Sequence, residues 1–435
     1  MKVFQYPKDR LKIARFCSPA GAQDPKTDKD VQKIIDRVRK RGDAAIIEMV
    51  EEFDKVKYAS AKEFFIPKSY LKTAWEGLPE KLQEALKLSL SRLKAYHERQ
   101  KIENFACKDK YGNHMEQRVT PIERVGVYVP GGTAAYPSTV LMDIVPAKVA
   151  GVKEIVMITP PRRPDFLEVQ ASLGAAWLAG VDEVVGVGGP LGVAAMAIGT
   201  DTLKRVDLIV GPGNKYVAAA KKLLYGEIDI DMIAGPSEIT IIADKSTPKE
   251  FIAADMLSQA EHDPDAQSVA IIIGTYDVPG LQHEIKSQAT ILPRKAMALD
   301  ALRKNGAIIN VQSREEAVMI ANMKAPEHLE ILAEKPRELA EKIPNVGAVF
   351  LGPYTPEPVG DYIAGPNHTL PTGGTARFYS PLSVMSFLKT SHIVEFTKEG
   401  LDALADATIT IAEAEGLTAH AEAVRCRLEK PKSNI

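Results

Sequence analysis

Two side chains that could bind a metal lie three residues apart at the end of an expected helix. Gln259 and His262 project from one face of its last turn. The helix opens at Thr247–Glu250, which supplies a hydroxyl cap, a proline in the first turn and a glutamate three residues after the cap, and Asp263-Pro264 closes it. An amide oxygen beside an imidazole is half of a metal site or a polar helix cap.

Further acids and imidazoles occur in three later segments. They are Glu327, His328, Asp361, His368, Glu415 and His420. The first two are adjacent between apolar segments, the next two lie in a loop rich in glycine and proline, and the last two lie in a helical tail. A histidine taken alone is more often a structural residue than a ligand. The ordinary alternatives here are a solvated ion pair, turn hydrogen bonds and an exposed helix face.

Considered together, these groups favour a metal. Loops that follow the strands of a parallel sheet are where such sheets bind ligands. Zinc accepts imidazole, carboxylate and amide oxygen. Gln259, His262, Asp361 and one further histidine would form a four-ligand set that leaves room for a substrate.

The elements that must position these groups alternate between strands and helices from Arg124 onward. The expected strands are short and apolar: 125–129, 154–159, 183–187, 206–210, 239–243, 269–274, 307–311 and 346–351. The expected helices between the earlier strands include 169–179, 193–198 and 216–224. This alternation predicts an α/β protein with parallel sheets covered by helices on both faces.

Three glycine-bearing turns follow strands in this alternation. They are 130–132, 186–190 and 211–214. None is a dinucleotide fingerprint, because Gly186, Gly188 and Gly192 are spaced one residue too widely and Pro190 interrupts them. Spacing alone leaves nucleotide binding and plain strand-to-helix corners as equal alternatives. Outside the alternation, residues 1–25 form a polar arm, and 27–53, 79–101 and 401–428 are expected helices.

Composition excludes several classes of function. The chain has 435 residues and a formal net charge of -2, which gives no electrostatic case for nucleic acid or an anionic membrane. It has no apolar stretch long enough to span a bilayer and no signal-peptide core. Its three scattered cysteines argue against disulfides and thiolate zinc clusters, so the cytoplasm is the expected compartment.

Seven motifs, in order along essentially the whole chain, resemble those of the histidinol dehydrogenase family. They are GPGN (211–214), AGPSE (234–238), QAEHD (259–263), APEHLE (325–330), VGDYIAGPNH (359–368), GGTARF (373–378) and EGLTAH (415–420). The resemblance implies a homodimer with one zinc per subunit and an intersubunit active site. The implied reaction is the oxidation of L-histidinol to L-histidine through L-histidinal, with two NAD reduced, in the last steps of histidine biosynthesis.

The resemblance also implies a fold of two incomplete Rossmann-like parallel-sheet domains, with small helical terminal domains exchanged between subunits. Residues 1–25 would be an N-terminal arm. Residues 26–123 and 237–380 would form a zinc and substrate domain, and 124–236 an NAD-binding domain. Residues 381–435 would form a helical domain that contributes to the partner's site.

The family's functional residues can be carried over position by position. The implied zinc ligands are Gln259, His262, Asp361 and, from the partner chain, His420. Histidinol would contact these four and also Ser237, Glu327, His328, His368 and, from the partner chain, Glu415. NAD would contact Tyr128, Asn214 and position 191, where this chain has Leu191 in place of the family's usual glutamine. That departure bears on the affinity or pose of the cofactor.

Two adjacent residues suit the two chemical steps. Loss of hydride from an alcohol requires a base for the hydroxyl proton, and the implied base is His328. The aldehyde must then be hydrated before a second hydride leaves, and Glu327 suits the activation of water. Zinc would position the imidazole and amine of the substrate rather than act as a redox centre.

Three other hypotheses compete with this one. A related NAD-dependent dehydrogenase could act on another small alcohol, such as a hydroxy-sulfonate, and Leu191 is its sequence support. A zinc hydrolase could use Glu327 on water without NAD, but the glycine turns argue against it. A catalytically silent relative is the least favoured, because all the expected catalytic side chains are present.

Overall fold

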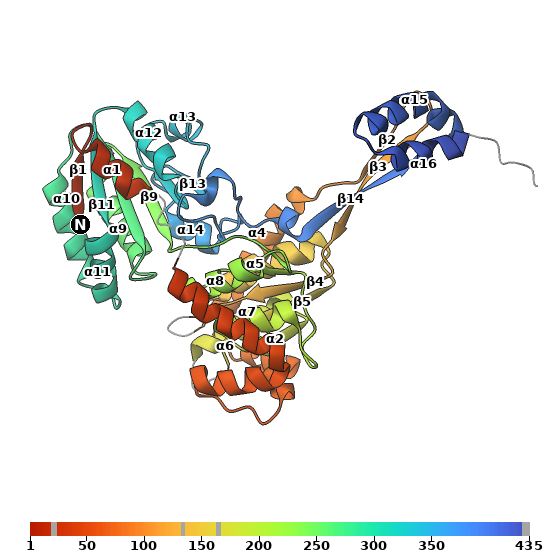
Figure 1. The fold of residues 1–435 in the computed structure, drawn as a ribbon. Helices are drawn as coiled ribbons and strands as arrows, with labels where there is room; N and C mark the ends of the chain where they lie inside the picture. Colours follow the sequence, from red (N-terminus) through yellow and green to blue (C-terminus); the bar gives the residue numbers. More distant parts are fainter. Residues whose placement is uncertain (19–23, 132–134, 162–166, 429–435) are drawn as a thin grey trace, which may run out of the picture. The chain divides into compact units, whose positions relative to one another are not determined.

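The computed structural model describes residues 1–18, 24–131, 135–161 and 167–428 (Figure 1). The chain divides into two compact units. The first contains Met1–Lys101 and Ile122–Phe387, and the second contains Ile102–Pro121 and Leu388–Ile435. Among the described residues, no helix is both long enough and apolar enough to cross a membrane.

The first unit contains a parallel sheet of order β1-β11-β10-β9-β12-β13. Its strands are Lys2–Gln5 (β1), Glu238–Ala243 (β9), Gln267–Ile273 (β10), Ala307–Val311 (β11), His328–Ile331 (β12) and Ala348–Leu351 (β13). One face packs on α9 (Lys249–Ala260), α10 (Val278–Ala289) and α11 (Lys295–Asn305). The other packs on α1 (Arg10–Cys17), α12 (Arg314–Lys324) and α13 (Pro336–Ala340).

A second parallel sheet in the same unit has the order β6-β5-β4-β7-β8. Its strands are Arg124–Tyr128 (β4), Glu154–Thr159 (β5), Glu183–Gly186 (β6), Leu208–Val210 (β7) and Asp229–Ile230 (β8). One face is covered by α2 (Pro25–Asp54), α7 (Gly189–Ile198) and α8 (Lys215–Leu224). The other is covered by α3 (Lys68–Glu76), α4 (Glu80–His97), α5 (Pro137–Ala150) and α6 (Leu167–Ala179).

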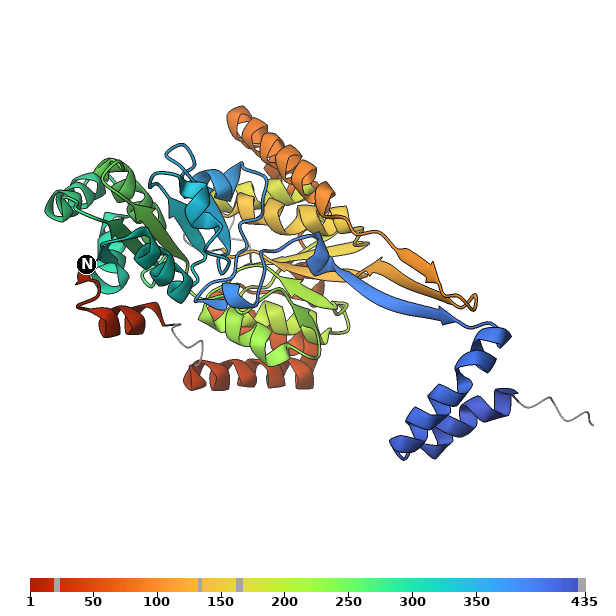
Figure 2. The same cartoon turned by 90° about the horizontal axis from the view of Figure 1, so that it is seen from above.

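The second unit is built on an antiparallel sheet of order β14-β3-β2. Its strands are Phe105–Lys108 (β2), His114–Pro121 (β3) and Leu388–Glu395 (β14), and Figure 2 shows β3 and β14 side by side. Helices α15 (Lys398–Ala414) and α16 (Thr418–Leu428) follow. Thr397 caps α15, since its hydroxyl accepts from Gly400 N at 2.9 Å.

The predicted alternation of parallel strands and helices is confirmed, and all eight expected strands are present. Three local predictions are wrong. Residues 1–25 were expected to be a polar arm, but they contain β1, which pairs with β11, and α1, which packs on the first sheet. Thr247 does not cap α9; its hydroxyl donates to the carbonyl of Leu332 at 3.2 Å, and the helix begins without a side-chain cap. The helix expected at 193–198 begins at Gly189, because Pro190 is tolerated in the first helical turn.

Candidate active site

His328 is the first residue of β12 and Glu327 directly precedes it, and both contact the first residue of β9. The backbone N–H of Glu238 donates to Glu327 Oε2 at 2.7 Å, and His328 Nδ1 lies 3.0 Å from the Glu238 carbonyl oxygen. Both catalytic candidates are buried. Because a carbonyl only accepts hydrogen bonds, Nδ1 carries the imidazole proton and Nε2 keeps a free lone pair.

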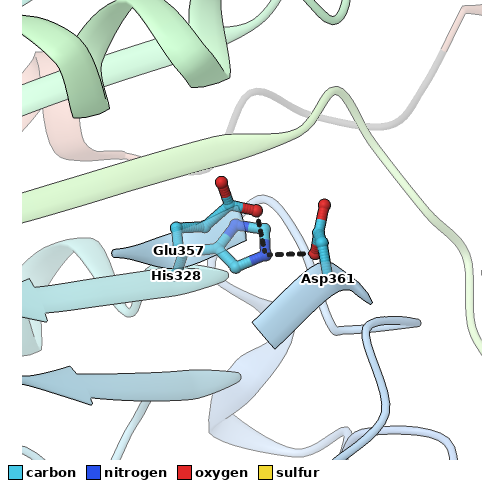
Figure 3. A group of neighbouring side chains, drawn as sticks. All are labelled: His328, Glu357 and Asp361. Carbon is cyan, nitrogen blue, oxygen red and sulfur yellow. Dashed lines mark ion pairs between the residues drawn. The ribbon is translucent and has the colours of Figure 1, made fainter. Parts of the chain in front are cut away.

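The free nitrogen of His328 faces two carboxyl groups from α14 (Glu357–Tyr362), as Figure 3 shows. Nε2 lies 3.7 Å from Glu357 Oε1 and 4.0 Å from Asp361 Oδ1. Within the described part of the chain, neither Nε2 nor Glu357 Oε1 has a hydrogen-bond partner. One ligand atom from each of the three residues lies within 4.8 Å of the others, a grouping that could hold a cation.

Burial controls the protonation of this cluster. It lowers the pKa of His328 to about 4, against the opposing attraction of Asp361. Burial, followed by the negative charge of Asp361, raises the pKa of Glu357 to about 9. It also raises the pKa of Glu327 well above the ordinary carboxyl value. At neutral pH the imidazole is therefore neutral and able to accept a proton.

Two further carboxyl groups, those of Glu330 and Asp255, lie near Glu357. Glu330 Oε1 accepts from the backbone N–H of Glu357 at 2.6 Å. Glu330 and Asp255 interact with each other, and burial raises the pKa of each. Because raised pKa values keep some of these carboxyls protonated, they can donate to one another without the repulsion of adjacent charges.

Helix α9 brings Gln259 and His262 toward the same cluster. Ser258, one residue before Gln259, donates to Glu357 Oε2 at 3.5 Å. Gln259 is buried, and its Oε1 has no hydrogen-bond partner among the described residues. His262 is exposed in the turn after α9. Burial lowers the pKa of both His328 and His368, and the nearby His262 adds a smaller contribution in the same direction. A buried amide oxygen without a partner is costly unless a ligand binds it, so this donor set suits zinc.

His368 lies in the segment that follows α14. Its Nδ1 lies 3.1 Å from the carbonyl oxygen of Asp361, and its Nε2 lies 3.2 Å from Thr139 Oγ1. The next residue, Thr369, donates its hydroxyl to Asp143 Oδ1 at 2.8 Å. The segment therefore joins α14 to α5, whose helix covers the second sheet. Ser237, which precedes β9, is half-buried.

The predicted cofactor residues lie at the carboxyl ends of the second sheet. Tyr128 ends β4, and its hydroxyl oxygen accepts from Gly189 N at 3.2 Å. Asn214 caps α8 by accepting from Tyr216 N at 3.0 Å. Leu191 lies in the first turn of α7 and is 1% exposed, so its side chain belongs to the core. The turn predicted at 130–132 is described only as far as Gly131.

The turn after β7 is fixed by a buried ion pair. Gly211 has a φ of +110°, and a Cβ there would overlap the carbonyl oxygen of Tyr128. Gly211 N donates to Asp231 Oδ2 at 2.8 Å, and the side chain of Lys221 pairs with the same carboxylate and donates to Gly211 O at 3.0 Å. The backbone of this turn therefore has one conformation, which only glycine adopts without overlap.

Comparison with known proteins agrees with this arrangement. The sequence profile of the histidinol dehydrogenase family matches residues 19–428. The chain belongs to the histidinol dehydrogenase family. It is 46% identical over 428 residues to the histidinol dehydrogenase of Clostridium acetobutylicum, covering 98% of this chain and 96% of that relative. It is 47% identical over 414 residues to that of Cupriavidus pinatubonensis, covering 94% and 93%.

A solved member of the histidinol dehydrogenase family shares the fold. The crystal structure of histidinol dehydrogenase from Elizabethkingia anophelis matches with a TM-score of 0.90 and 34% sequence identity, and the match covers 98% of each chain. The two parallel sheets and their covering helices are therefore the architecture of a histidinol dehydrogenase.

The structure gathers most of the residues named for the histidinol dehydrogenase site in the first unit. Hydrogen bonds and charge contacts connect His262, Glu327, His328, Asp361 and His368. Gln259 directly follows Ser258, whose hydroxyl donates to Glu357. Glu415 and His420 belong to the second unit, where Glu415 follows α15 and His420 lies in α16, and both are exposed.

Sequence reasoning missed two residues that shape this histidinol dehydrogenase site. Glu357 lies just before the motif at 359–368 and was not singled out, although its carboxyl faces His328. Glu238 was included only as part of a motif, although its backbone contacts both catalytic candidates. The spacing of Glu357 and Asp361, four residues apart, was the available signal, since a helical turn places such residues on one face.

Proposed function

We propose that this protein oxidises L-histidinol to L-histidine through L-histidinal, transferring two hydrides to NAD, in the last steps of histidine biosynthesis. The observation that carries the proposal is the buried pair Glu327-His328, with a neutral imidazole whose Nε2 is free. It occurs in a chain that belongs to the histidinol dehydrogenase family over residues 19–428. Bound NAD would accept each hydride.

In the first step we assign His328 as the base. The substrate alcohol loses a hydride from carbon and a proton from oxygen, which leaves the aldehyde. Nε2 of His328 takes the hydroxyl proton, while the bond from Nδ1 to the carbonyl of Glu238 holds the ring and stabilises the imidazolium that forms. Burial favours the neutral form of the ring, so the proton is readily passed on before the second step.

In the second step we assign Glu327 to the hydration of the aldehyde. The carboxylate takes a proton from water as the oxygen adds to the aldehyde carbon, and the resulting hydrate loses its second hydride to give the carboxylic acid. The raised pKa of Glu327 makes its carboxylate a stronger base than an exposed one. The hydrogen bond from Glu238 N fixes one oxygen of this carboxyl and leaves the other for water.

We propose Gln259, His262 and Asp361, with His420 of the partner subunit, as the ligands of one zinc per subunit. The unsatisfied Gln259 Oε1 and the chemistry of the donor set support this choice. Bound zinc would anchor the imidazole and amine of histidinol and keep the aldehyde in place between steps. Ser237, His368 and Glu415 of the partner subunit would complete the substrate contacts.

We assign NAD to residues 124–236, with Tyr128, Asn214 and position 191 as its contacts. The zinc and substrate part would be 237–380 with β1 and α1, since the helices of residues 25–97 cover the second sheet, and residues 381–435 would reach the partner's site. The burial of Leu191 indicates that position 191 contributes through the shape of the α7 turn rather than through a polar contact. We place the enzyme in the cytoplasm, where its three free cysteines would stay reduced.

The shared site can be tested by mixing two inactive variants, His328→Asn and His420→Ala. If each site combines His328 of one subunit with the partner's His420, half of the dimers in an equal mixture carry one variant of each kind. Each mixed dimer has one intact and one doubly altered site, so about a quarter of the wild-type activity returns for random exchange in a C2 dimer. A mixture as inactive as its components would contradict the exchanged arrangement.

The reaction is tested by giving the zinc-loaded enzyme limiting L-histidinol and excess NAD. Two NADH per histidinol is the expected yield, and the His328→Asn variant should lose turnover while retaining zinc. One NADH would show that the aldehyde escapes and would contradict the second step. No NADH from histidinol, with NADH from another small alcohol, would replace the proposed substrate.

A further inference from the structure

A buried ion pair adjoins the proposed catalytic residues Glu327 and His328. Glu238 is the first residue of β9 and Lys324 the last residue of α12, and both are buried. Their side chains pair through Glu238 Oε2, and Gly373 N donates to Glu238 Oε1 at 3.1 Å. Both oxygens of the carboxylate are therefore occupied, and the charged groups are 5% and 6% exposed.

The backbone of Glu238 holds two catalytic side chains at once. Its N–H donates to Glu327 Oε2 at 2.7 Å, and its carbonyl accepts from His328 Nδ1 at 3.0 Å. In a strand the N–H and C=O of one residue point to the same side, and here that side faces the neighbouring strand β12. A shift of Glu238 would therefore move the anchor of the base and the anchor of the carboxylate together.

Lys324 lies three residues before Glu327 on the segment that delivers the catalytic pair. Between them, Ala325 has a φ of +48° and ends α12, and Pro326 leads into β12. On the far side of β12, Ala348 N donates to Glu327 O at 2.8 Å. The ion pair thus joins the helix that precedes the catalytic residues to the strand that binds their side chains.

We propose that Lys324 and Glu238 are positioning residues that set the geometry of Glu327 and His328. This inference rests on the proposed catalytic roles of that pair. Neither side chain of the ion pair reaches the substrate; the effect passes through the backbone of β9 and through the turn at Ala325. Because removing two charges from water offsets most of their attraction, a buried pair contributes little net stability, and its directed contacts are its main effect.

The test separates positioning from stability with three variants. Glu238→Gln and Lys324→Met each leave one buried charge without its partner. The double variant Glu238→Gln/Lys324→Met removes both charges and therefore leaves no buried charge without a partner. Of the three variants it is the one that folds most readily. Each would be compared with the wild type by thermal melting, by kcat and KM for histidinol, and by the number of NADH formed per histidinol consumed.

Arg124→Met is the matched control. Arg124 is buried and pairs with Glu154 and Glu183, and all three residues begin strands, at the end of the second sheet opposite to the cofactor turns. This variant should melt at a lower temperature than the wild type, while kcat changes less than 2-fold and two NADH are still formed.

We expect the double variant to melt close to the wild type but to lose at least 10-fold in kcat. KM should change less than about 3-fold, and the yield should fall from two NADH toward one, because Glu327 is misplaced for hydration. A double variant that retains the wild-type kcat and two NADH would overturn the proposal, as would single variants that behave like Arg124→Met. If the wild type itself forms no NADH from histidinol, the proposed function fails. In that case the positioning role is tested with the alcohol that the wild type does oxidise. It fails if the double variant retains the wild-type kcat for that alcohol.

Discussion

Replacing Asp143 with Asn should stabilise the protein at alkaline pH far more than at acid pH. Asp143 lies in α5, is completely buried, and accepts a hydrogen bond from the hydroxyl of Thr369 at 2.8 Å. Its Oδ2 has no partner among the described residues. Burial, together with the charge of Asp231, raises the pKa of Asp143 to about 8, although the hydrogen bond from Thr369 and the charge of Lys221 oppose the rise.

The direction of this pH dependence follows from which state of the protein binds the proton of Asp143. Between the ordinary carboxyl pKa and about 8, the folded protein holds a proton on Asp143 that the unfolded chain has released. The free energy of unfolding of the wild type therefore falls as pH rises through this window and levels off above it. Asn resembles the protonated acid and can still accept a hydrogen bond from the hydroxyl of Thr369. The free energy of unfolding of the variant therefore lacks this pH dependence.

The magnitude can be worked from the shift. From pH 5 to pH 8 the free energy of unfolding of the wild type falls by about 1.4 kcal/mol per pH unit because of Asp143. The difference in free energy of unfolding in favour of the Asn variant therefore grows by roughly 4 kcal/mol over that range. Urea midpoints of both proteins at pH 5, 7 and 9 measure it, and Asp36→Asn, an exposed substitution in α2, is the control. An advantage that stays constant or shrinks with rising pH would refute a neutral, buried Asp143.

Three further substitutions have defined outcomes. Gly211→Ala should cost at least about 3 kcal/mol or prevent soluble expression, because the added Cβ overlaps the carbonyl of Tyr128 at a positive φ; a melting temperature equal to the wild type would contradict this. Gln259→Leu should reduce bound zinc well below one per subunit in metal analysis of the dialysed protein, with melting of the metal-free form little changed. Thr139→Val should raise KM for histidinol several-fold with a smaller change in kcat, because His368 loses its partner on Nε2; steady-state kinetics would show it, and an unchanged KM would remove His368 from the substrate contacts.

The sequence predicted the parallel strands well because they are short apolar runs bounded by glycine and polar residues. The prediction failed for strands whose formation depends on contacts with distant residues and not on a local apolar pattern. Strand β12 alternates the polar residues His328 and Glu330 with Leu329 and Ile331, and because it is only four residues long with buried polar side chains, it was not predicted as a strand. Strand β1 is only four residues long, and its pairing with β11 depends on residues far along the chain.

The candidate site was predictable only as a set of residue types. The motifs named Glu327 and His328, but which ring nitrogen of His328 is free depends on the carbonyl of Glu238, a backbone contact that no side-chain pattern encodes. The shifted pKa values likewise arise from burial, which the sequence does not give residue by residue. Glu357 looked like one acid in a loop because its importance depends on the helical turn that directs it to Nε2.

The pairing of β1 with β11 has a consequence for synthesis of the protein. Lys2 lies opposite Ala307, so the edge of the first sheet is completed by residues translated about 300 positions apart. At about 5–20 residues per second, β1 waits for roughly 15–60 s before its partner strand leaves the ribosome. During that interval the nascent chain carries an unpaired strand, and β11 then emerges with an open edge until the two meet. Strand β1 is therefore made before the other strands of this sheet but can join it only after β11 has emerged, and a chaperone that shields β1 would act early in translation.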